Sequence, residues 1–209
     1  MHTIFLNKFF FEKRFKTYHE KLGKVTNFFF TDRKKIPSEV IINKLNKNSA
    51  VIFREYDLEK NERFYLAQKI RRICKQRGCL FFVGKDLDLA LKIKADGVHL
   101  SDKDNLSKLK LLYRKNINSN FLMSLSCHDY KMIKKHNNSF ADLFFISPIF
   151  KTSSHPNSKH LGKEYLDKCC AISNKPIFAL GGVDSDNLKI ISLGKSSGFG
   201  AISFYKTLL

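Results

Sequence analysis

The chain has 209 residues, of which 43% are hydrophobic, 27% charged and 13% aromatic. This composition excludes a disordered chain and supplies enough apolar surface for one full core. No apolar run approaches the ~20 residues of a transmembrane helix, and the five cysteines include no C-x-x-C pair. We therefore expect a cytoplasmic protein without a disulfide framework or a zinc site.

The formal net charge is +19. A strongly basic balance is typical of proteins that bind nucleic acid, membrane surfaces or phosphorylated substrates. Lysine is spread along almost the whole chain, however, as on a solvated surface, and no recognition motif accompanies it. We expect no specific nucleic-acid partner, and the sequence does not predict an oligomeric state.

The first predicted element, at residues 1–24, is a basic amphipathic helix. Phe5, Phe9, Phe15 and Leu22 recur among Lys, Arg and Glu at spacings that suit one helical face. The segment lacks a small-residue cleavage site, which argues against a secretory signal. Packing on the rest of the domain is favoured over membrane binding as the role of this helix.

Residues 25–209 alternate predicted strands with predicted helices. The strands are apolar runs at 27–31, 50–53, 80–83, 98–100, 121–125, 143–146, 177–180 and 199–203. The helices are expected at 37–45, 59–76, 87–93, 105–114 and 129–136, from residue 163, and after residue 184. The alternation predicts an α/β fold, and eight strands favour a single TIM (β/α)8 barrel over a doubly wound sheet.

Two features of this barrel are unusual. Only FYKTLL follows the eighth predicted strand, so the last helix must be short or missing, and we expect the N-terminal helix to cover that place. The segment 147–162 is a polar loop long enough to act as a lid rather than a simple connection.

The residues that follow each strand of such a barrel form its active face. These positions carry Arg54, Glu55, Gly84 to Asp86, Ser101 to Asp104, Ser126, His128, Thr152 to His155, Gly181, Gly182 and Ser203. Gly181 and Gly182 allow backbone N–H groups to approach a phosphate closely, although a pair of glycines also suits an ordinary turn. His99 lies within a strand and is expected to be a core residue rather than a ligand.

Several of these segments together resemble one known family. FFVGKDLDLALKIKADGVHL, SLSCHD, ADLFFISPIFKTSSH and KPIFALGGVDSDN are similar, in this order, to the strand-end motifs of the thiamin phosphate synthase and TenI family. The resemblance runs from about residue 27 to residue 203. It implies a TIM barrel that binds a small phosphorylated thiazole, in agreement with the fold that the periodicity predicts.

The resemblance to the synthase branch implies Mg²⁺, held by carboxylates at two strand ends. Asp104 matches the second of these, but Lys85 stands where the first is expected, and a cation cannot serve as a magnesium ligand. Asp86, one residue further on, is the substitute ligand if the chain is a synthase. In the tautomerase branch neither residue is needed, and no cofactor is implied.

The motifs divide the site into two halves. In the pyrimidine diphosphate half, Arg54 is retained and His155 replaces an expected Lys. The family's hydroxyl and phosphate-binding positions are filled by Thr152, Ser154, Ser126, Gly181, Gly182, Ile202 and Ser203. The last four form the thiazole phosphate half, which is complete. This asymmetry resembles TenI, the thiazole tautomerase, and predicts that the chain is closer to TenI in its site residues.

The resemblance to TenI also implies a catalytic histidine after the fifth strand, a position that His128 occupies. An imidazole titrates near neutrality and can take and return a proton without a metal. His128 is alternatively a polar residue at the start of the next helix, and Arg54 is alternatively one half of an ion pair inside the barrel mouth.

Three functions remain open. The first is a TenI-like tautomerase that uses His128. The second is a divergent, Mg²⁺-dependent synthase that joins pyrimidine diphosphate to thiazole phosphate through Asp104 and Asp86. The third is a phosphate-binding or regulatory barrel without catalysis.

Overall fold

The computed structural model describes residues 22–23, 25–101, 104, 121–152 and 159–209. Eight parallel strands close into one barrel in chain order, and β1 pairs with both β2 and β8. The strands are β1 (Asn27–Phe30), β2 (Ser49–Phe53), β3 (Leu80–Gly84), β4 (Gly97–Ser101), β5 (Leu122–Cys127), β6 (Leu143–Ile146), β7 (Ile177–Leu180) and β8 (Gly198–Ala201). The predicted TIM barrel is confirmed.

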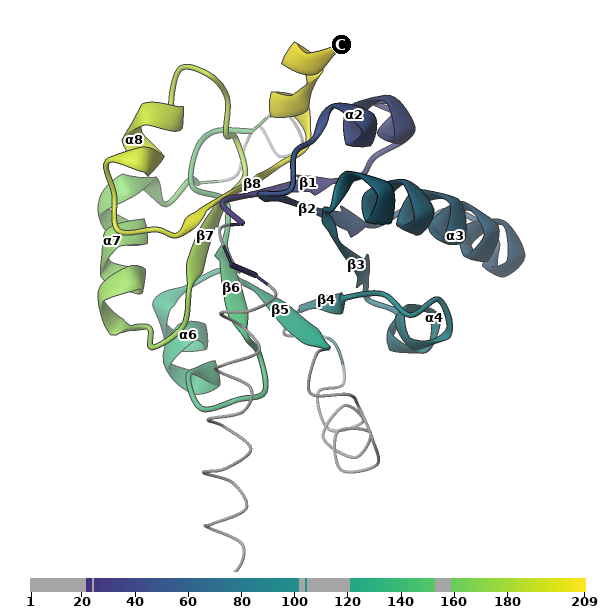
Figure 1. The fold of residues 1–209 in the computed structure, drawn as a ribbon. Helices are drawn as coiled ribbons and strands as arrows, with labels where there is room; N and C mark the ends of the chain where they lie inside the picture. The colour runs from purple at the N-terminus through teal and green to yellow at the C-terminus, as the bar shows by residue number, and fades with distance from the viewer. Residues whose placement is uncertain (1–21, 24, 102–103, 105–120, 153–158) are drawn as a thin grey trace, which may run out of the picture.

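Helices surround this barrel (Figure 1). They are α2 (Ser38–Lys44), α3 (Lys60–Arg77), α4 (Leu87–Lys92), α6 (Tyr130–His136), α7 (Gly162–Ile172), α8 (Leu188–Ser192) and the 3-10 helix η1 (Ser203–Leu208). The N-terminal helix predicted at residues 1–24 and the helix predicted at 105–114 fall outside the described residues, apart from residues 22 and 23.

Alternation along the strands places one set of side chains inside the barrel and the other beneath the helices. The inner set includes five phenylalanines, Phe28, Phe30, Phe82, Phe145 and Phe178. Phe28 meets Phe145 and Phe178 edge to face, with ring centroids 5.0 and 4.8 Å apart. Packed rings therefore close the barrel below its carboxyl-terminal mouth, where the strand ends lie.

The eighth strand ends earlier than the sequence predicts. It stops at Ala201, and Ser203 begins η1 instead of ending the strand. The hydroxyl of Tyr205 donates to Asn27 Oδ1 at 3.0 Å. Its ring packs edge to face on the Phe29 ring, with the ring centroids 5.1 Å apart. The expected short last helix is thus a 3-10 turn, and it packs on the outside of β1.

Strands β3, β4 and β5 extend further than predicted. Gly84, Ser101 and Ser126 are the last or penultimate residues of their strands rather than loop residues. The apolar runs predict strand ends before the polar residues Ser101 and Ser126, yet the hydrogen-bonded ladder pairs these two residues with each other.

The cysteines behave as core residues. Four of the five are buried and none forms a disulfide. Burial raises the pKa of Cys79 and of Cys169 to about 11, which disfavours the reactive thiolate. In the described part of the chain, none of the helices combines the length and the apolar character that crossing a membrane requires.

Candidate functional site

The turn after β7 presents two consecutive glycines with left-handed backbone. The φ angles are 89° at Gly181 and 71° at Gly182, values that suit residues without a Cβ. Within the described residues, the N–H groups of this pair donate to no protein acceptor. Adjacent free N–H groups in such a turn form a concave site for an anion.

The loop after β6 packs directly on this turn. Ile149 N donates to Leu180 O at 2.9 Å, and Phe150 N donates to Gly181 O at 3.0 Å. A Cβ at Gly182 would lie 2.3 Å from Lys151 O. The Asn187 side chain donates to Gly182 O at 2.8 Å and holds the other side of the turn. The glycines are therefore required by close packing as well as by conformation.

His128 lies at the mouth, just beyond β5, and is exposed. Its Nδ1 lies 3.0 Å from the carbonyl oxygen of Ser147, at the end of β6. Nδ1 must carry the proton in that bond, so the neutral ring has its lone pair on Nε2. The N-cap of α6 is Asp129, which accepts from Met132 N at 2.8 Å. His128 is thus not the capping residue of that helix.

His99 is buried inside the barrel, as expected for a core residue. Its Nδ1 lies 2.8 Å from Ser124 Oγ, and its Nε2 lies 3.0 Å from Ser126 Oγ. Burial, with smaller contributions from Arg54 and Lys85, lowers the pKa of His99 to about 3. The ring is therefore neutral near pH 7, and it holds the predicted ligand-binding hydroxyl of Ser126 in place.

Arg54 follows β2 and reaches the barrel mouth. Its side-chain Nε donates to the carbonyl oxygen of Thr31 at 3.1 Å, and its backbone N donates to Thr31 Oγ1 at 3.0 Å. The guanidinium is also 3.7 Å from Asp32 Oδ2 and is 31% exposed. The predicted ion pair is present but long, so the guanidinium can also contact a ligand.

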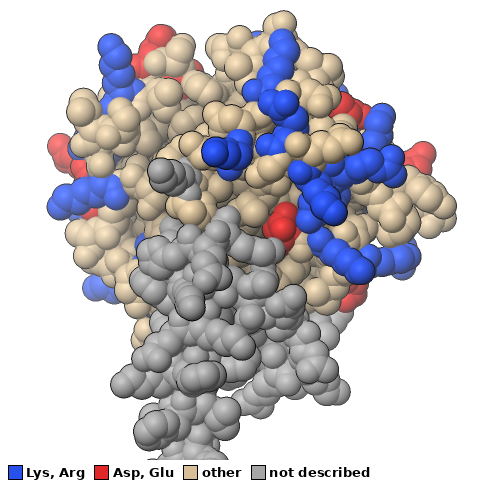
Figure 2. All heavy atoms as spheres, viewed as in Figure 1, with Lys and Arg blue, Asp and Glu red and all other residues tan. Residues whose placement is uncertain are grey.

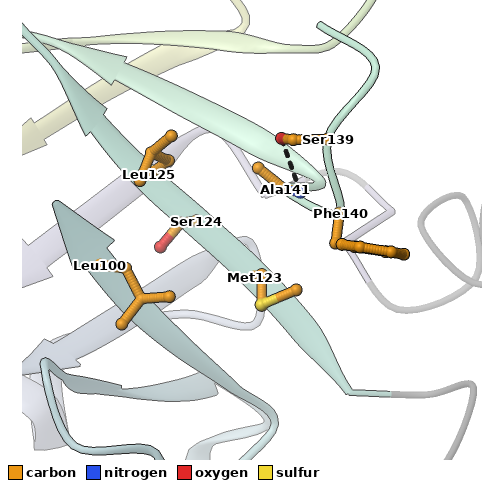
Figure 3. A pocket seen from close by; sticks show the side chains of 7 residues that line it. All are labelled: Leu100, Met123, Ser124, Leu125, Ser139, Phe140 and Ala141. Atoms are coloured by element: carbon orange, nitrogen blue, oxygen red, sulfur yellow. Dashed lines mark hydrogen bonds between the residues drawn. The ribbon is translucent and has the colours of Figure 1, made fainter. Parts of the chain in front are cut away.

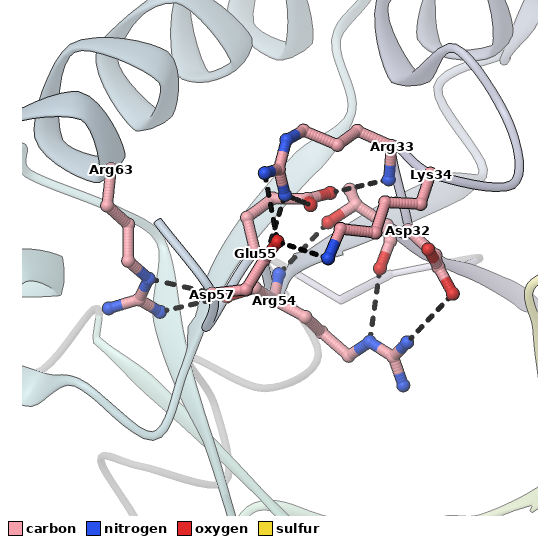
Figure 4. Close-up of polar contacts among 8 residues, drawn as sticks. Asp32, Arg33, Lys34, Arg54, Glu55, Asp57 and Arg63 are labelled. Carbon is pink, nitrogen blue, oxygen red and sulfur yellow. Dashed lines mark hydrogen bonds and ion pairs between the residues drawn. The ribbon is translucent and has the colours of Figure 1, made fainter. Parts of the chain in front are cut away.

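Glu55, next to Arg54, belongs to an ion-pair network drawn in Figure 4. Its side chain is 4% exposed, and it accepts from Arg33 Nη1 at 2.9 Å. The other carboxylate on Arg33 is Asp57, at 2.6 Å. Arg33 and Lys34 hold the pKa of Asp57 well below its ordinary value. The network joins the loops that follow β1 and β2.

Lys85 and Tyr56 lie together after β3 and β2. The ammonium of Lys85 is 5.3 Å from the centre of the Tyr56 ring, within cation–π range. A Cβ at Gly84 would lie 2.3 Å from the Tyr56 hydroxyl, so this hydroxyl sits against the end of β3. Desolvation there raises the pKa of Tyr56, and the nearby Asp104 adds to the rise while Arg54 and Arg63 oppose it.

The two expected magnesium ligands are both engaged by the protein. Asp86 caps α4 by accepting from Leu89 N at 2.9 Å, and its other oxygen accepts from Arg63 at 2.7 Å. Asp104 Oδ2 accepts from the N–H and the hydroxyl of Ser101, at 2.6 and 2.9 Å. In the described ranges, no three His, Cys, Asp or Glu residues group as a metal site would require. These donors do not fit Mg²⁺ as they stand.

The remaining predicted residues lie in two places. Ile202 is half-buried and packs on both apolar clusters beside the start of η1, where Ser203 is exposed. Thr152 is the last described residue before the undescribed segment 153–158, which contains Ser154 and His155. Closure of the 147–162 loop as a lid stays a prediction.

Sequence reasoning missed Arg63. This residue comes from α3 and is 8% exposed, in a buried stripe that continues with Ala67, Ile70 and Cys74. The stripe has spacings of four, three and four residues, which is the pattern of a helix face. An arginine on the apolar face of a predicted helix was the signal, because a buried cation needs partners.

The shallow hollow in Figure 3 lies elsewhere. Its lining is Leu100, Met123, Ser124, Leu125, Ser139, Phe140 and Ala141. Three of these, Leu100, Met123 and Leu125, belong to the layer outside the strands. The described lining carries no charge, so the hollow is a poor place for a phosphorylated ligand.

Basic side chains dominate part of the surface. In Figure 2, Lys and Arg gather right of centre on the visible face, where Figure 1 places α2 and α3. The chain has 38 Lys and Arg residues against 19 Asp and Glu residues. This distribution favours anionic ligands in general, and the absence of a specific nucleic-acid partner stays a prediction.

The protein is a closed (β/α)8 barrel, a class of fold in which the loops that follow the strands form the functional face, and here those loops carry glycines and cations. The family model described as thiamine monophosphate synthase matches residues 29–203. The chain therefore belongs to the thiamine monophosphate synthase and TenI family. This confirms the family that the sequence motifs predict.

Named relatives support the same assignment. A putative thiamine-phosphate synthase 2 from Aquifex aeolicus is 32% identical over 84% of this chain and 94% of its own length. A thiamine-phosphate synthase from Prochlorococcus marinus is 34% identical over 68% of this chain, which spans 40% of that longer protein. These names do not support the expectation that the chain is closer to TenI.

A solved structure shows the same fold. The thiamine phosphate pyrophosphorylase from Pyrococcus furiosus superposes with a TM-score of 0.76 at 23% identity, covering 88% of this chain and 91% of that one. At this level of identity the likeness concerns the fold alone.

Proposed function

We propose that this chain is a thiamine-phosphate synthase, which joins a pyrimidine diphosphate to a thiazole phosphate. The names of the relatives support this reaction over the tautomerase that the sequence motifs favoured. The observation that supports it is that groups able to bind anions lie in two separate places at the mouth. Gly181 and Gly182 offer N–H groups at one end, while Arg54 and Lys85 offer cations at the other.

Each end suits one phosphorylated substrate of this reaction. The bond between the pyrimidine methyl carbon and the diphosphate oxygen breaks, and the diphosphate leaves with the electron pair. The thiazole nitrogen then gives its lone pair to that carbon, so no proton has to move. Cations near the diphosphate stabilise the charge that develops as it leaves. The N–H groups of Gly181 and Gly182 bind the phosphate of the thiazole and so direct its ring nitrogen toward the pyrimidine methyl carbon.

The test is formation of thiamine phosphate from the two substrates by the pure protein, with a known synthase as the positive control. We expect turnover by the wild-type protein. Arg54→Met should lower kcat/KM for the pyrimidine diphosphate at least tenfold, because a charge-assisted contact is lost. Arg72→Met, at an exposed position of α3, is the matched control and should stay within twofold. Absence of product from the wild-type protein would exclude the synthase.

A thiazole tautomerase is the second candidate, and the position of His128 favours it. The bond from Nδ1 to Ser147 O leaves Nε2 available as a base at the mouth. The ring can therefore take a proton from one ring atom of a thiazole carboxylate phosphate and return it to another.

The tautomerase reading predicts that interconversion of the two thiazole carboxylate tautomers is catalysed and that His128→Asn slows it 10²-fold or more, the usual range for a general base. Lys131→Asn, at an exposed position of α6 close to His128 in the sequence, is the control. NMR of the substrate in D2O measures the exchange. If thiazole phosphate binds without either reaction, the chain is a non-catalytic binding protein.

A further inference from the structure

A residue outside the predicted site, Arg63, makes several contacts at the mouth. The guanidinium of Arg63 donates through Nη1 to Asp86 Oδ2 at 2.7 Å. It also donates through Nη2 to the carbonyl oxygens of Arg54 and Gly84, at 3.1 and 2.9 Å. One buried side chain thereby joins the ends of β2 and β3 to the first turn of α4. Figure 4 shows Arg63 reaching from its helix toward Arg54.

Two aromatic rings complete the surroundings of this guanidinium. Its central carbon lies 5.6 Å from the centre of the Phe53 ring and 5.5 Å from that of Tyr56. Both are within the range of cation–π attraction. Planar stacking and a fixed fork of donors are properties of arginine that lysine lacks. The geometry around Arg63 is therefore specific for this residue.

Arg63 also determines which charges face the mouth. By pairing with Asp86 it removes a carboxylate that would otherwise be available to a metal ion. The neighbouring Lys85 has no carboxylate within ion-pair distance among the described residues. Its φ angle is 59°, which is uncommon for a residue with a side chain. The bond from Lys85 N to His99 O, 2.8 Å long, fixes this backbone.

The cations Arg54 and Lys85 flank the segment that Arg63 holds. The carbonyl of Arg54 is one of its acceptors, and Lys85 lies between two others, Gly84 and Asp86. An anion at this end would meet two positive side chains that extend from a backbone held by Arg63.

We propose that Arg63 is a positioning residue that arranges Arg54 and Lys85 as a diphosphate site working without a divalent cation. The proposal rests on the proposed function for its ligand, because only the synthase reaction brings a diphosphate to this end. It differs from that function in assigning the neutralising charge to side chains. In this arrangement Arg63 forms an ion pair with Asp86, the carboxylate that would otherwise bind a metal ion.

The experiment measures binding of inorganic pyrophosphate to the whole chain by isothermal titration calorimetry, in EDTA and in excess Mg²⁺. The wild-type protein is expected to bind in EDTA, with less than a twofold gain from Mg²⁺. Arg63→Lys should weaken pyrophosphate binding at least tenfold, while binding of thiazole phosphate, which uses the other end of the mouth, stays within twofold.

Arg77→Lys is the matched control. Arg77 belongs to the same helix and donates through Nε and Nη2 to a backbone carbonyl, that of Leu45, at 3.2 and 3.0 Å. It does so at the opposite end of the barrel. This variant should leave both affinities within twofold. Equal losses of pyrophosphate binding in Arg63→Lys and Arg77→Lys would overturn the positioning role.

A second pair of variants keeps the proposal testable if Arg63→Lys does not fold. Lys85→Ala should weaken pyrophosphate binding at least fivefold in EDTA. Lys94→Ala, at an exposed position of similar φ, 54°, should not. Pyrophosphate binding that requires Mg²⁺ in the wild-type protein would overturn the inference. The thiamine phosphate assay separates the two failures, because Mg²⁺-dependent turnover would overturn only the inference, whereas a lack of turnover would overturn the proposed function.

Discussion

Gly182→Ala is expected to weaken binding of thiazole phosphate at least tenfold and to destabilise the barrel. Two effects act together at this residue. The left-handed backbone costs a residue with a Cβ about 1–2 kcal/mol, and the Cβ would lie 2.3 Å from Lys151 O and 2.6 Å from Phe150 O. The turn or the loop must shift, at a further cost of about 1–3 kcal/mol. That shift moves the N–H groups away from the phosphate.

Gly162→Ala separates the two effects. Gly162 has a similar φ angle, 78°, but an added Cβ would have no neighbour within 4 Å. It should therefore show only the backbone cost, about 1–2 kcal/mol, with thiazole phosphate affinity unchanged. Urea unfolding and calorimetry measure both quantities. Equal effects of the two variants on binding would contradict the close packing of the loop on the turn.

The protein should lose stability as the pH falls from about 6.5 toward 3, and His99 should cause a large part of the loss. The folded state keeps this imidazole neutral, since burial lowers its pKa to about 3. The unfolded chain binds the proton below its ordinary pKa near 6.5. Unfolding then takes up one proton, so the free energy of unfolding falls by up to ~1.4 kcal/mol per pH unit. The total is of order 4 kcal/mol across this range.

His99→Gln tests the assignment. The variant has no imidazole at this position, so it should take up nearly one proton fewer on unfolding between about pH 4 and 6. The slope of the unfolding free energy against pH should decrease accordingly. His160→Gln, an exposed histidine, is the control and should keep the wild-type slope. Carboxylates with lowered pKa values, such as Asp57 and Asp167, add to the acid loss at lower pH in all three proteins. An unchanged slope in His99→Gln would show that the buried ring does not cause the loss of stability at acid pH.

Much of the candidate site follows from the sequence because strand ends converge in a parallel barrel. Once eight strands are recognised, Arg54, His128 and the Gly181–Gly182 turn must lie at the same mouth. The two glycines could be singled out because a pair of glycines after a strand lets backbone N–H groups approach a phosphate, and both have left-handed backbone angles in the structure. The choice between tautomerase and synthase does not follow from the sequence in the same way, because missing motif residues do not reveal what the residues in their place contact.

The sequence by itself determined the alternation of strands and helices, and hence the barrel, because apolar periodicity is a local property that any window of the chain displays. It also placed His99 in the core, since a polar residue inside an apolar strand is most often buried and satisfied. Only the tertiary structure decided that Ser124 and Ser126 are the hydrogen-bond partners of this histidine. It also decided that Arg63 donates to Asp86 and to the carbonyl oxygens of Arg54 and Gly84. Such partners come from different strands and helices, and their distances exist only once the barrel has closed.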